Sequence, residues 1–328
     1  MHKFTFFYPN GEEKTLKYET KRYLCICLLL KLHCIMKIRL LLLSLLMLLA
    51  VMPVSAQTES ASIETMDSVK INGNMRRYRL VLPRHTDGHT PLVVLLHGYN
   101  CDIDPVTCMD SIARAEGFAL CVPQGLADPT GVRGWNVGYP MQKGWQVDDV
   151  DDLCRLVRHL QRKHKLSPTD AFLTGMSNGG EMCYLMAYSN RRVFKAIGSV
   201  AGLTLVWMYK QFTPQRQVPF MEIHGTEDRV SEWTGDIDNR GGWNAYLPVP
   251  IAVGRMVALN RCTHEQVEEL PARTPSNGHR VVKHSFLGGD NGCDVWLYEV
   301  VGGDHCWHTA DMDTGQELWR FFKQYVGK

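Results

Sequence analysis

The chain has 328 residues, of which 36 are Lys or Arg and 34 are Asp or Glu, so its formal charge is only +2. The first 56 residues hold 8 of these basic and 3 of these acidic side chains, which leaves the remaining 272 residues slightly acidic. This balance gives no basis for a nucleic-acid partner. A length of 272 residues suits one α/β domain with a substantial core and leaves nothing over for a second module.

The N-terminal part has the order of a secretory signal peptide. Lys37 and Arg39 precede an apolar run from Leu40 to Met52, and Val54-Ser55-Ala56 then places small residues at the cleavage positions. The run is short for a membrane span. We therefore expect a secreted or periplasmic protein without a stable membrane anchor. The expected divisions are an upstream extension over 1–35, a signal peptide over 36–56 and the folded domain over 57–328.

An uncleaved anchor that begins earlier, near Tyr23, is the alternative interpretation. Lys31, His33, Lys37 and Arg39 interrupt that longer run and argue against it.

Apolar runs alternate with helical patterns along residues 57–328. Such alternation predicts a single α/β domain, with a mostly parallel central sheet and helices on both of its faces. The expected strands are 76–82, 92–96, 119–122, 171–174, 194–201, 219–223 and 295–301. The expected helices are 106–116, 148–163, 181–188, 251–260 and 314–325. The polar stretch between Cys262 and Cys293 is expected to be a loop.

The most informative motif is Gly175-Met176-Ser177-Asn178-Gly179, which lies between an expected strand and an expected helix. In this setting G-x-S-x-G is typical of a nucleophile elbow, the tight turn that exposes the catalytic serine of an α/β-hydrolase. Glycines at both ends permit close backbone approach. The helix N-terminus offers N–H groups and a positive dipole end to a developing oxyanion. We therefore predict that Ser177 is a nucleophile.

An acid and a base follow Ser177 in the order that α/β-hydrolases use. Asp228 comes just after the expected strand 219–223, and His305 comes just after the last expected strand, 295–301. His305 would take the serine proton and return it to the leaving alcohol, while Asp228 would orient the imidazole. Glu227 is the alternative acid and His308 the alternative base.

The loop after the strand 92–96 is a candidate oxyanion loop. In this fold one donor is the backbone N–H of the residue after the nucleophile, here Asn178, and the other comes from the loop after the third strand, here Tyr99. His97 opens the same loop, and we expect it to be a buried imidazole that braces the loop.

Eight cysteines follow residue 56, and an even number in an exported protein favours disulfides. Cys262 and Cys293 are the expected pair, because they close a polar loop and would stabilise the fold by about 3–4 kcal/mol. The pairing of the others stays open: Cys101, Cys108, Cys121, Cys154, Cys183 and Cys306. Asp304, His305, Cys306 and His308 form a conceivable metal cluster, but their spacing matches no recognised ligand motif, so no metal is expected.

These motifs together resemble the secreted esterases that group feruloyl esterases of carbohydrate esterase family 1 with polyhydroxybutyrate-depolymerase-like proteins. The resemblance spans roughly residues 70 to 325. It implies an α/β-hydrolase fold, a triad of Ser177, Asp228 and His305, and no metal or organic cofactor. The matching segments include Leu96-His97-Gly98-Tyr99-Asn100, Gly134-Trp135-Asn136, Val147-Asp148-Asp149-Val150, Thr174-Gly175-Met176-Ser177-Asn178-Gly179-Gly180, Ile223-His224-Gly225-Thr226-Glu227-Asp228, Leu247-Pro248-Val249-Pro250, Asn260-Arg261-Cys262 and Asn291-Gly292-Cys293.

One segment departs from the family pattern. The family usually ends in G-G-G-H-T-W-P-G, whereas this chain has Gly302-Gly303-Asp304-His305-Cys306-Trp307-His308-Thr309. The His and Trp are kept, but an acid precedes the base and the Pro is lost. This departure bears on the substrate more than on the catalytic step.

The resemblance implies an ester-substituted polysaccharide or a small ester as substrate. A feruloyl or related hydroxycinnamoyl ester of plant xylan is the leading expectation, followed by acetyl-xylan and polyhydroxyalkanoate esters. Trp135, Trp243 and Trp307 are the aromatic side chains expected to stack on such a substrate. Two alternatives of other classes are a serine peptidase on the same fold and a non-catalytic carbohydrate-binding protein.

Overall fold

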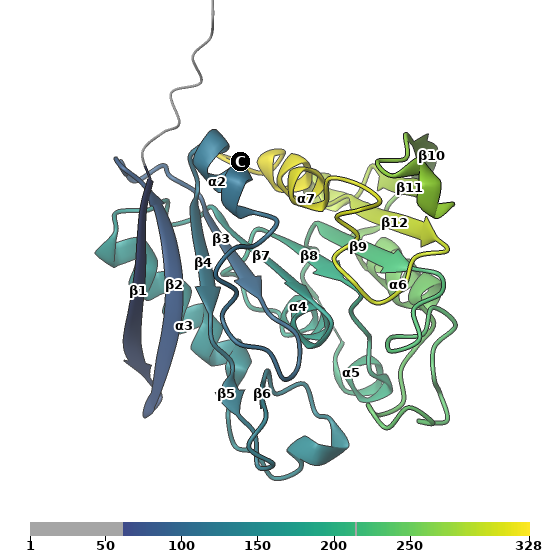
Figure 1. Cartoon of the computed structure of the whole chain (residues 1–328), viewed down its shortest axis with the longest axis horizontal. Coiled ribbons are helices and arrows are strands. Elements are labelled where there is room, and N and C mark those ends of the chain that lie inside the picture. The colour runs from purple at the N-terminus through teal and green to yellow at the C-terminus, as the bar shows by residue number, and fades with distance from the viewer. Residues whose placement is uncertain (1–61, 214) are drawn as a thin grey trace, which may run out of the picture. The chain divides into compact units, whose positions relative to one another are not determined.

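The computed structural model describes residues 62–213 and 215–328 (Figure 1). The predicted upstream extension and signal peptide, residues 1–56, lie outside these described residues. No helix among the described residues is long and apolar enough to cross a bilayer.

The described residues form one ten-stranded sheet in the order β1-β2-β4-β3-β7-β8-β9-β12-β11-β10. Its central strands, from β4 to β12, are parallel, and antiparallel pairs flank them on both sides. The strands are β1 Ser62–Ile71, β2 Asn74–Pro83, β3 Leu92–Leu96, β4 Ala119–Pro123, β7 Ala171–Met176, β8 Ala196–Val200, β9 Phe220–Gly225, β10 His264–Leu270, β11 Arg280–Leu287 and β12 Val295–Val301. A separate short ribbon pairs β5 Leu126–Ala127 with β6 Arg133–Gly134.

Helices cover both faces of the sheet, as predicted (Figure 1). One core packs beneath α3 Asp149–Lys163, α4 Asn178–Tyr188 and α6 Val249–Asn260, and a second packs beneath α2 Asp110–Glu116 and α7 Thr314–Lys323. The short α5 Val206–Gln211 follows β8. In α3, buried apolar side chains recur at helical spacing and the Asp148 side chain caps the first turn through the Asp151 N–H. The α/β-hydrolase architecture expected from the sequence is confirmed.

Two expectations about local structure are wrong. The helix expected over 106–116 begins only at Asp110, because the Asp110 carboxylate accepts from the Thr107 N–H and holds the preceding residues in a turn. The polar stretch between Cys262 and Cys293 is not a loop but contains the hairpin β10–β11. Strand β10 exposes nearly every side chain. An exposed, charged edge strand has no apolar alternation from which it could be predicted.

Candidate active site

Ser177 stands at the turn from β7 to α4 with a backbone φ of +57° and ψ of −124°. A β-carbon added to Gly175 would lie 2.6 Å from the Gly179 carbonyl carbon, and one added to Gly179 would lie 2.6 Å from the Leu96 oxygen. Only glycine fits at either position, because the obstructing atoms are backbone. The turn thus has the strained, tightly packed geometry of a nucleophile elbow, with the Ser177 side chain partly exposed at its tip.

Asp228 and His305 form a hydrogen-bonded pair. His305 Nδ1 lies 2.7 Å from Asp228 Oδ2, and the imidazole remains partly exposed. The other carboxylate oxygen accepts from the Val230 and Ser231 amides at 2.8 and 2.7 Å. Burial raises the pKa of Asp228, but its hydrogen bonds with His305 and with the loop amides outweigh burial and hold the pKa below its usual range. Asp228 is therefore an ionised acceptor that fixes the imidazole orientation.

Backbone contacts join the loop of the acid to the loop of the base. The Glu227 N–H donates to the Gly303 oxygen at 2.9 Å, and the Gly302 N–H donates to the Thr226 hydroxyl at 2.9 Å. These loops follow β9 and β12, which pair in parallel, so both emerge at the same edge of the sheet. The alternative acid, Glu227, is excluded from the imidazole contact because Asp228 occupies it.

His224 supports the acid from beneath and was not expected from the sequence. It is fully buried, with Nδ1 2.9 Å from Glu222 Oε1 and Nε2 2.7 Å from the Ser231 carbonyl. Burial lowers its pKa, but Glu222 and the carbonyl raise it overall above the usual value. The imidazole thereby ties β9 to the loop whose amides hold Asp228.

His308, the alternative base, is turned into the interior. It is 1% exposed, and its Nδ1 lies 3.1 Å from Asp311 Oδ2. Within the described residues its Nε2 is buried without a hydrogen-bond partner. A nitrogen in that position does not reach a substrate, so the geometry favours His305 as the base.

The expected oxyanion loop lies against the elbow. A β-carbon on Gly98 would sit 3.5 Å from the Ser177 β-carbon. Across the described part of the chain, the backbone N–H groups of Tyr99 and Asn178 donate to no protein acceptor. His97 is buried and braces the loop as expected, with Nδ1 2.7 Å from the Gly98 carbonyl and Nε2 accepting from the Gly125 N–H at 2.9 Å.

A small cavity of about 20 Å³ opens beside Ser177. Its aromatic wall consists of Tyr99, Tyr139 and Trp243, whose rings contact one another with centroids 5.2 to 5.9 Å apart. Because Val230 and Ser231 also line it, the cavity connects the nucleophile with the loop that holds Asp228. The full lining is Tyr99, Tyr139, Ser177, Glu181, Leu203, Val230, Ser231 and Trp243.

Glu181 is an acid in this cavity that was not expected from the sequence. It lies in the first turn of α4, is 1% exposed, and its Oε2 has no hydrogen-bond partner within the described residues. Burial raises its pKa to about 8, although hydrogen bonds with Tyr139 and Asn178 oppose the shift. The raised pKa favours the protonated, neutral form of this carboxyl group, which lies four residues after Ser177 in the chain.

The three expected substrate-binding tryptophans occupy different environments. Trp243 lines the cavity. Trp135 does not: it is fully buried, and its indole N–H donates to the His97 carbonyl at 2.9 Å. Its backbone also pairs with the Asn178 side chain, so Trp135 is a packing residue behind the elbow. Trp307 packs against the core under α2 and α7 and is absent from the cavity lining.

The expected disulfide is absent. Cys262 and Cys293 are both free thiols, and the Cys262 sulfur contacts the Cys293 carbonyl oxygen at 3.7 Å. The two residues are thus neighbours, as the sequence implied, but the Cys262 thiol is directed to the backbone. The other cysteines among the described residues are free as well.

One catalytic contact is missing from this geometry. Among the described residues, the Ser177 hydroxyl makes no hydrogen bond to His305. Catalytic hydrogen bonds are often long without substrate and tighten when it binds. The structure therefore brings together Asp228 with His305, and Ser177 with the Asp228 loop.

The chain is similar in sequence to known hydrolases. A model described as the prolyl oligopeptidase family matches residues 111–249. The probable feruloyl esterase C of Aspergillus niger is 25% identical over 258 residues, covering 73% of this chain and 84% of that protein. The chain is a serine ester hydrolase.

Feruloyl esterase D of Neurospora crassa is 24% identical, over 79% of this chain and 85% of that protein. Among solved structures, an acetyl xylan esterase from Aspergillus awamori superposes with a TM-score of 0.53 over 79% of this chain and 99% of that one, at 12% identity. That likeness concerns the fold alone. The chain thus shares its fold with that acetyl xylan esterase.

Proposed function

We propose that this serine ester hydrolase uses a triad of Ser177, His305 and Asp228, with the backbone N–H groups of Tyr99 and Asn178 as the oxyanion hole. The observation that carries the proposal is the 2.7 Å contact between His305 Nδ1 and Asp228 Oδ2, at the sheet edge where the elbow presents Ser177. Two groups far apart in sequence meet there, and their contact is the one that joins the acid and the base of a catalytic triad.

The chemistry proceeds in two transfers. His305 Nε2 takes the hydroxyl proton as Ser177 Oγ attacks the ester carbonyl, and the tetrahedral oxyanion forms beside the two backbone N–H groups. Collapse breaks the bond to the alkoxy group, which leaves as an alcohol with the proton from His305. Water then attacks the acyl-enzyme with His305 again as base, releasing the acid and restoring Ser177.

The acyl group proposed is a feruloyl or related hydroxycinnamoyl group on a plant cell-wall polysaccharide. The aromatic wall of Tyr99, Tyr139 and Trp243 supports this choice. The flat aromatic ring of a hydroxycinnamoyl group would pack edge-to-face or offset-stacked against such side chains. The relatives named for feruloyl esterase activity support it as well. Export through the predicted signal peptide would bring the protein to such a substrate.

Substitution of the nucleophile tests the triad. The variant Ser177→Ala is expected to lose at least about 10⁴-fold in kcat on p-nitrophenyl acetate with an unchanged melting temperature. A phosphonate that labels Ser177 in the native chain and not in the variant is the matched measurement. Retained turnover in Ser177→Ala would overturn the proposed nucleophile.

An ester panel with one leaving group tests the acyl preference. We expect kcat/KM on methyl ferulate to exceed that on methyl acetate, and Trp243→Ala to lose about 10- to 100-fold on the ferulate only. Trp243→Phe should keep most of the preference. Equal losses on both esters would remove the aromatic wall from acyl recognition, and a preference for acetyl or 3-hydroxybutyryl esters would replace the feruloyl proposal.

Peptidase activity is the competing outcome, because the family whose model matches residues 111–249 is named after a peptidase, prolyl oligopeptidase. A dipeptide anilide assayed beside the esters separates the two. Cleavage of the anilide with a kcat/KM comparable to that of the esters would contradict the proposal of a cell-wall ester as substrate.

A further inference from the structure

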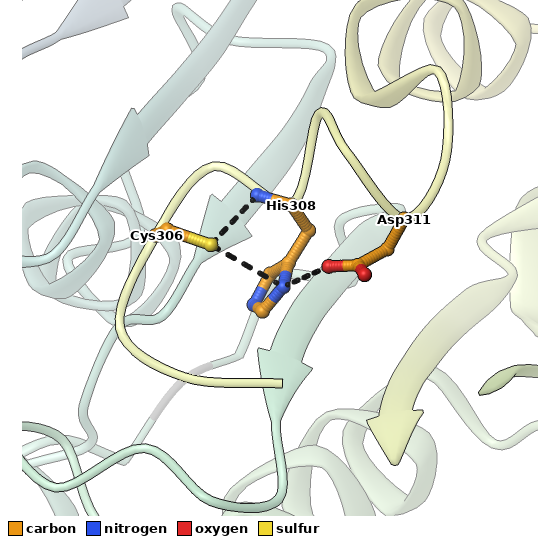
Figure 2. Close-up of side chains that lie close together, drawn as sticks. All are labelled: Cys306, His308 and Asp311. Carbon is orange, nitrogen blue, oxygen red and sulfur yellow. Dashed lines mark hydrogen bonds and ion pairs between the residues drawn. The ribbon is translucent and has the colours of Figure 1, made fainter. Parts of the chain in front are cut away.

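Three potential metal ligands meet on the loop that carries the proposed base. Figure 2 shows the side chains of Cys306, His308 and Asp311 directed toward one another. Cys306 Sγ lies 3.6 Å from His308 Nδ1, which lies 3.1 Å from Asp311 Oδ2, and one ligand atom of each residue is within 4.8 Å of the others. His308 and Asp311 are buried, whereas Cys306 is partly exposed and leaves the group open on one side.

We propose that these three side chains bind one Zn²⁺ ion. Tetrahedral zinc with ordinary ligand bonds separates a sulfur from a nitrogen ligand by about 3.6 Å, and a nitrogen from an oxygen ligand by about 3.3 Å. The observed separations of 3.6 and 3.1 Å match these edges closely. The thiolate and imidazole favour zinc over the hard cations Ca²⁺ and Mg²⁺, which take oxygen ligands.

The surroundings of Asp311 leave one of its oxygens for a cation. Its Oδ1 accepts from the Asn277 amide at 2.6 Å and contacts His279 Nδ1 at 2.8 Å. These contacts orient the carboxylate so that Oδ2 faces His308, and hydrogen-bonded carboxylates of this kind are common in metal sites. The Thr314 hydroxyl holds the intervening loop by donating to the Trp307 carbonyl at 2.6 Å.

The proton balance of binding is simple. Zinc would displace the proton of the Cys306 thiol to solvent, because only the thiolate is a ligand. In neutral His308 the proton would move from Nδ1 to Nε2, the nitrogen that lacks a partner among the described residues. One proton is therefore released per ion bound. The fourth position would go to water or to Asp304, whose carboxylate hydrogen-bonds with the Cys306 thiol.

The site would be structural. Cys306 directly follows His305, so an ion bound to the loop would restrict the backbone that places the imidazole. The resemblance to known esterases implied no metal, so the proposed site is a departure particular to the Cys306 and His308 of this loop. Metal content does not depend on ester hydrolysis, so the proposal stands or fails separately from the proposed function.

Metal binding by the purified full chain is the test. After dialysis against a chelator, Zn²⁺ is titrated while bound zinc is measured by mass spectrometry and the melting temperature by calorimetry. We expect one ion per chain and a rise in melting temperature of about 5 °C or more at 100 times Kd. The variants Cys306→Ser and Asp311→Asn should lose both effects, whereas Cys101→Ser, at an exposed cysteine outside the cluster, should keep them.

Cobalt provides a readout in the unaltered chain. Co²⁺ in place of zinc should give the visible bands of a tetrahedral site and a near-ultraviolet thiolate-to-cobalt absorption that Zn²⁺ abolishes. A chain that binds less than one equivalent, or whose cobalt spectrum lacks the thiolate band, would overturn the site even if the variants failed to fold.

Discussion

The two halves of the candidate site are built in different ways. The nucleophile half is one continuous piece, since β7, the Ser177 turn and the first turn of α4 lie within about a dozen residues. The base half joins Asp228 and His305, which are 77 residues apart and meet only because β9 and β12 are neighbours in the sheet.

Different contacts hold the two halves in place, so different substitutions should disrupt them. Backbone atoms in van der Waals contact hold the elbow, so its geometry is set by glycines at fixed positions. The base half depends on hydrogen bonds between two loops, reinforced by buried His224. We therefore expect changes in the base half to alter activity through the position of His305.

The largest effect is expected from removal of the imidazole. His305→Ala should lower kcat by about 10³- to 10⁵-fold, because no neighbouring group replaces the base. His284→Ala is the matched control: His284 Nδ1 also lies 2.7 Å from a carboxylate, that of Glu265, but on the hairpin β10–β11. Steady-state kinetics should show a near-native kcat for the control. Equal losses in both variants would contradict a special role for the His305–Asp228 pair over the His284–Glu265 pair.

A smaller effect is expected from a methyl group between the two loops. A β-carbon on Gly225 would lie 2.3 Å from the Gly303 oxygen, so Gly225→Ala must push the base loop away from β9. Misplacement by about 1 Å costs about 100-fold in rate. Gly254→Ala on α6 meets no atom within 4 Å and should leave kcat unchanged while adding up to about 1 kcal/mol of stability. Unimpaired turnover by Gly225→Ala would show that the loop contact does not position His305.

Local determinants explain what could be predicted. The elbow was predictable because its glycines, strand and helix are contiguous, and strand β12 was predicted with its observed bounds, Val295–Val301. The Asp228–His305 contact was predictable from chain order, because carboxyl ends of adjacent parallel strands share one edge of the sheet.

Long-range packing explains what was missed. Trp135 looked like a loop aromatic free to bind substrate, yet its burial depends on Asn178 and His97, which precede or follow it by about 40 residues. Glu181 looked like an ordinary acid in the first turn of a helix, where carboxylates are common. Only the folded chain reveals that Tyr139, Leu203 and Trp243 enclose the same cavity.

The smallest expected effect is a pH dependence of stability that arises from Glu181, a residue of the nucleophile half. Because the pKa of Glu181 is raised to about 8, the folded chain keeps a proton that the unfolded chain releases above its ordinary carboxyl pKa. Stability should therefore fall as pH rises from about 5 to 8 and level off above that range. Glu181→Gln, which mimics the neutral acid, should remove this component, whereas Glu268→Gln on exposed β10 should keep the native profile. Melting temperatures measured across this range check the prediction. Parallel profiles for Glu181→Gln and the native chain would mean that Glu181 is ionised in the fold, and that the cavity beside Ser177 already holds a negative charge at pH 7.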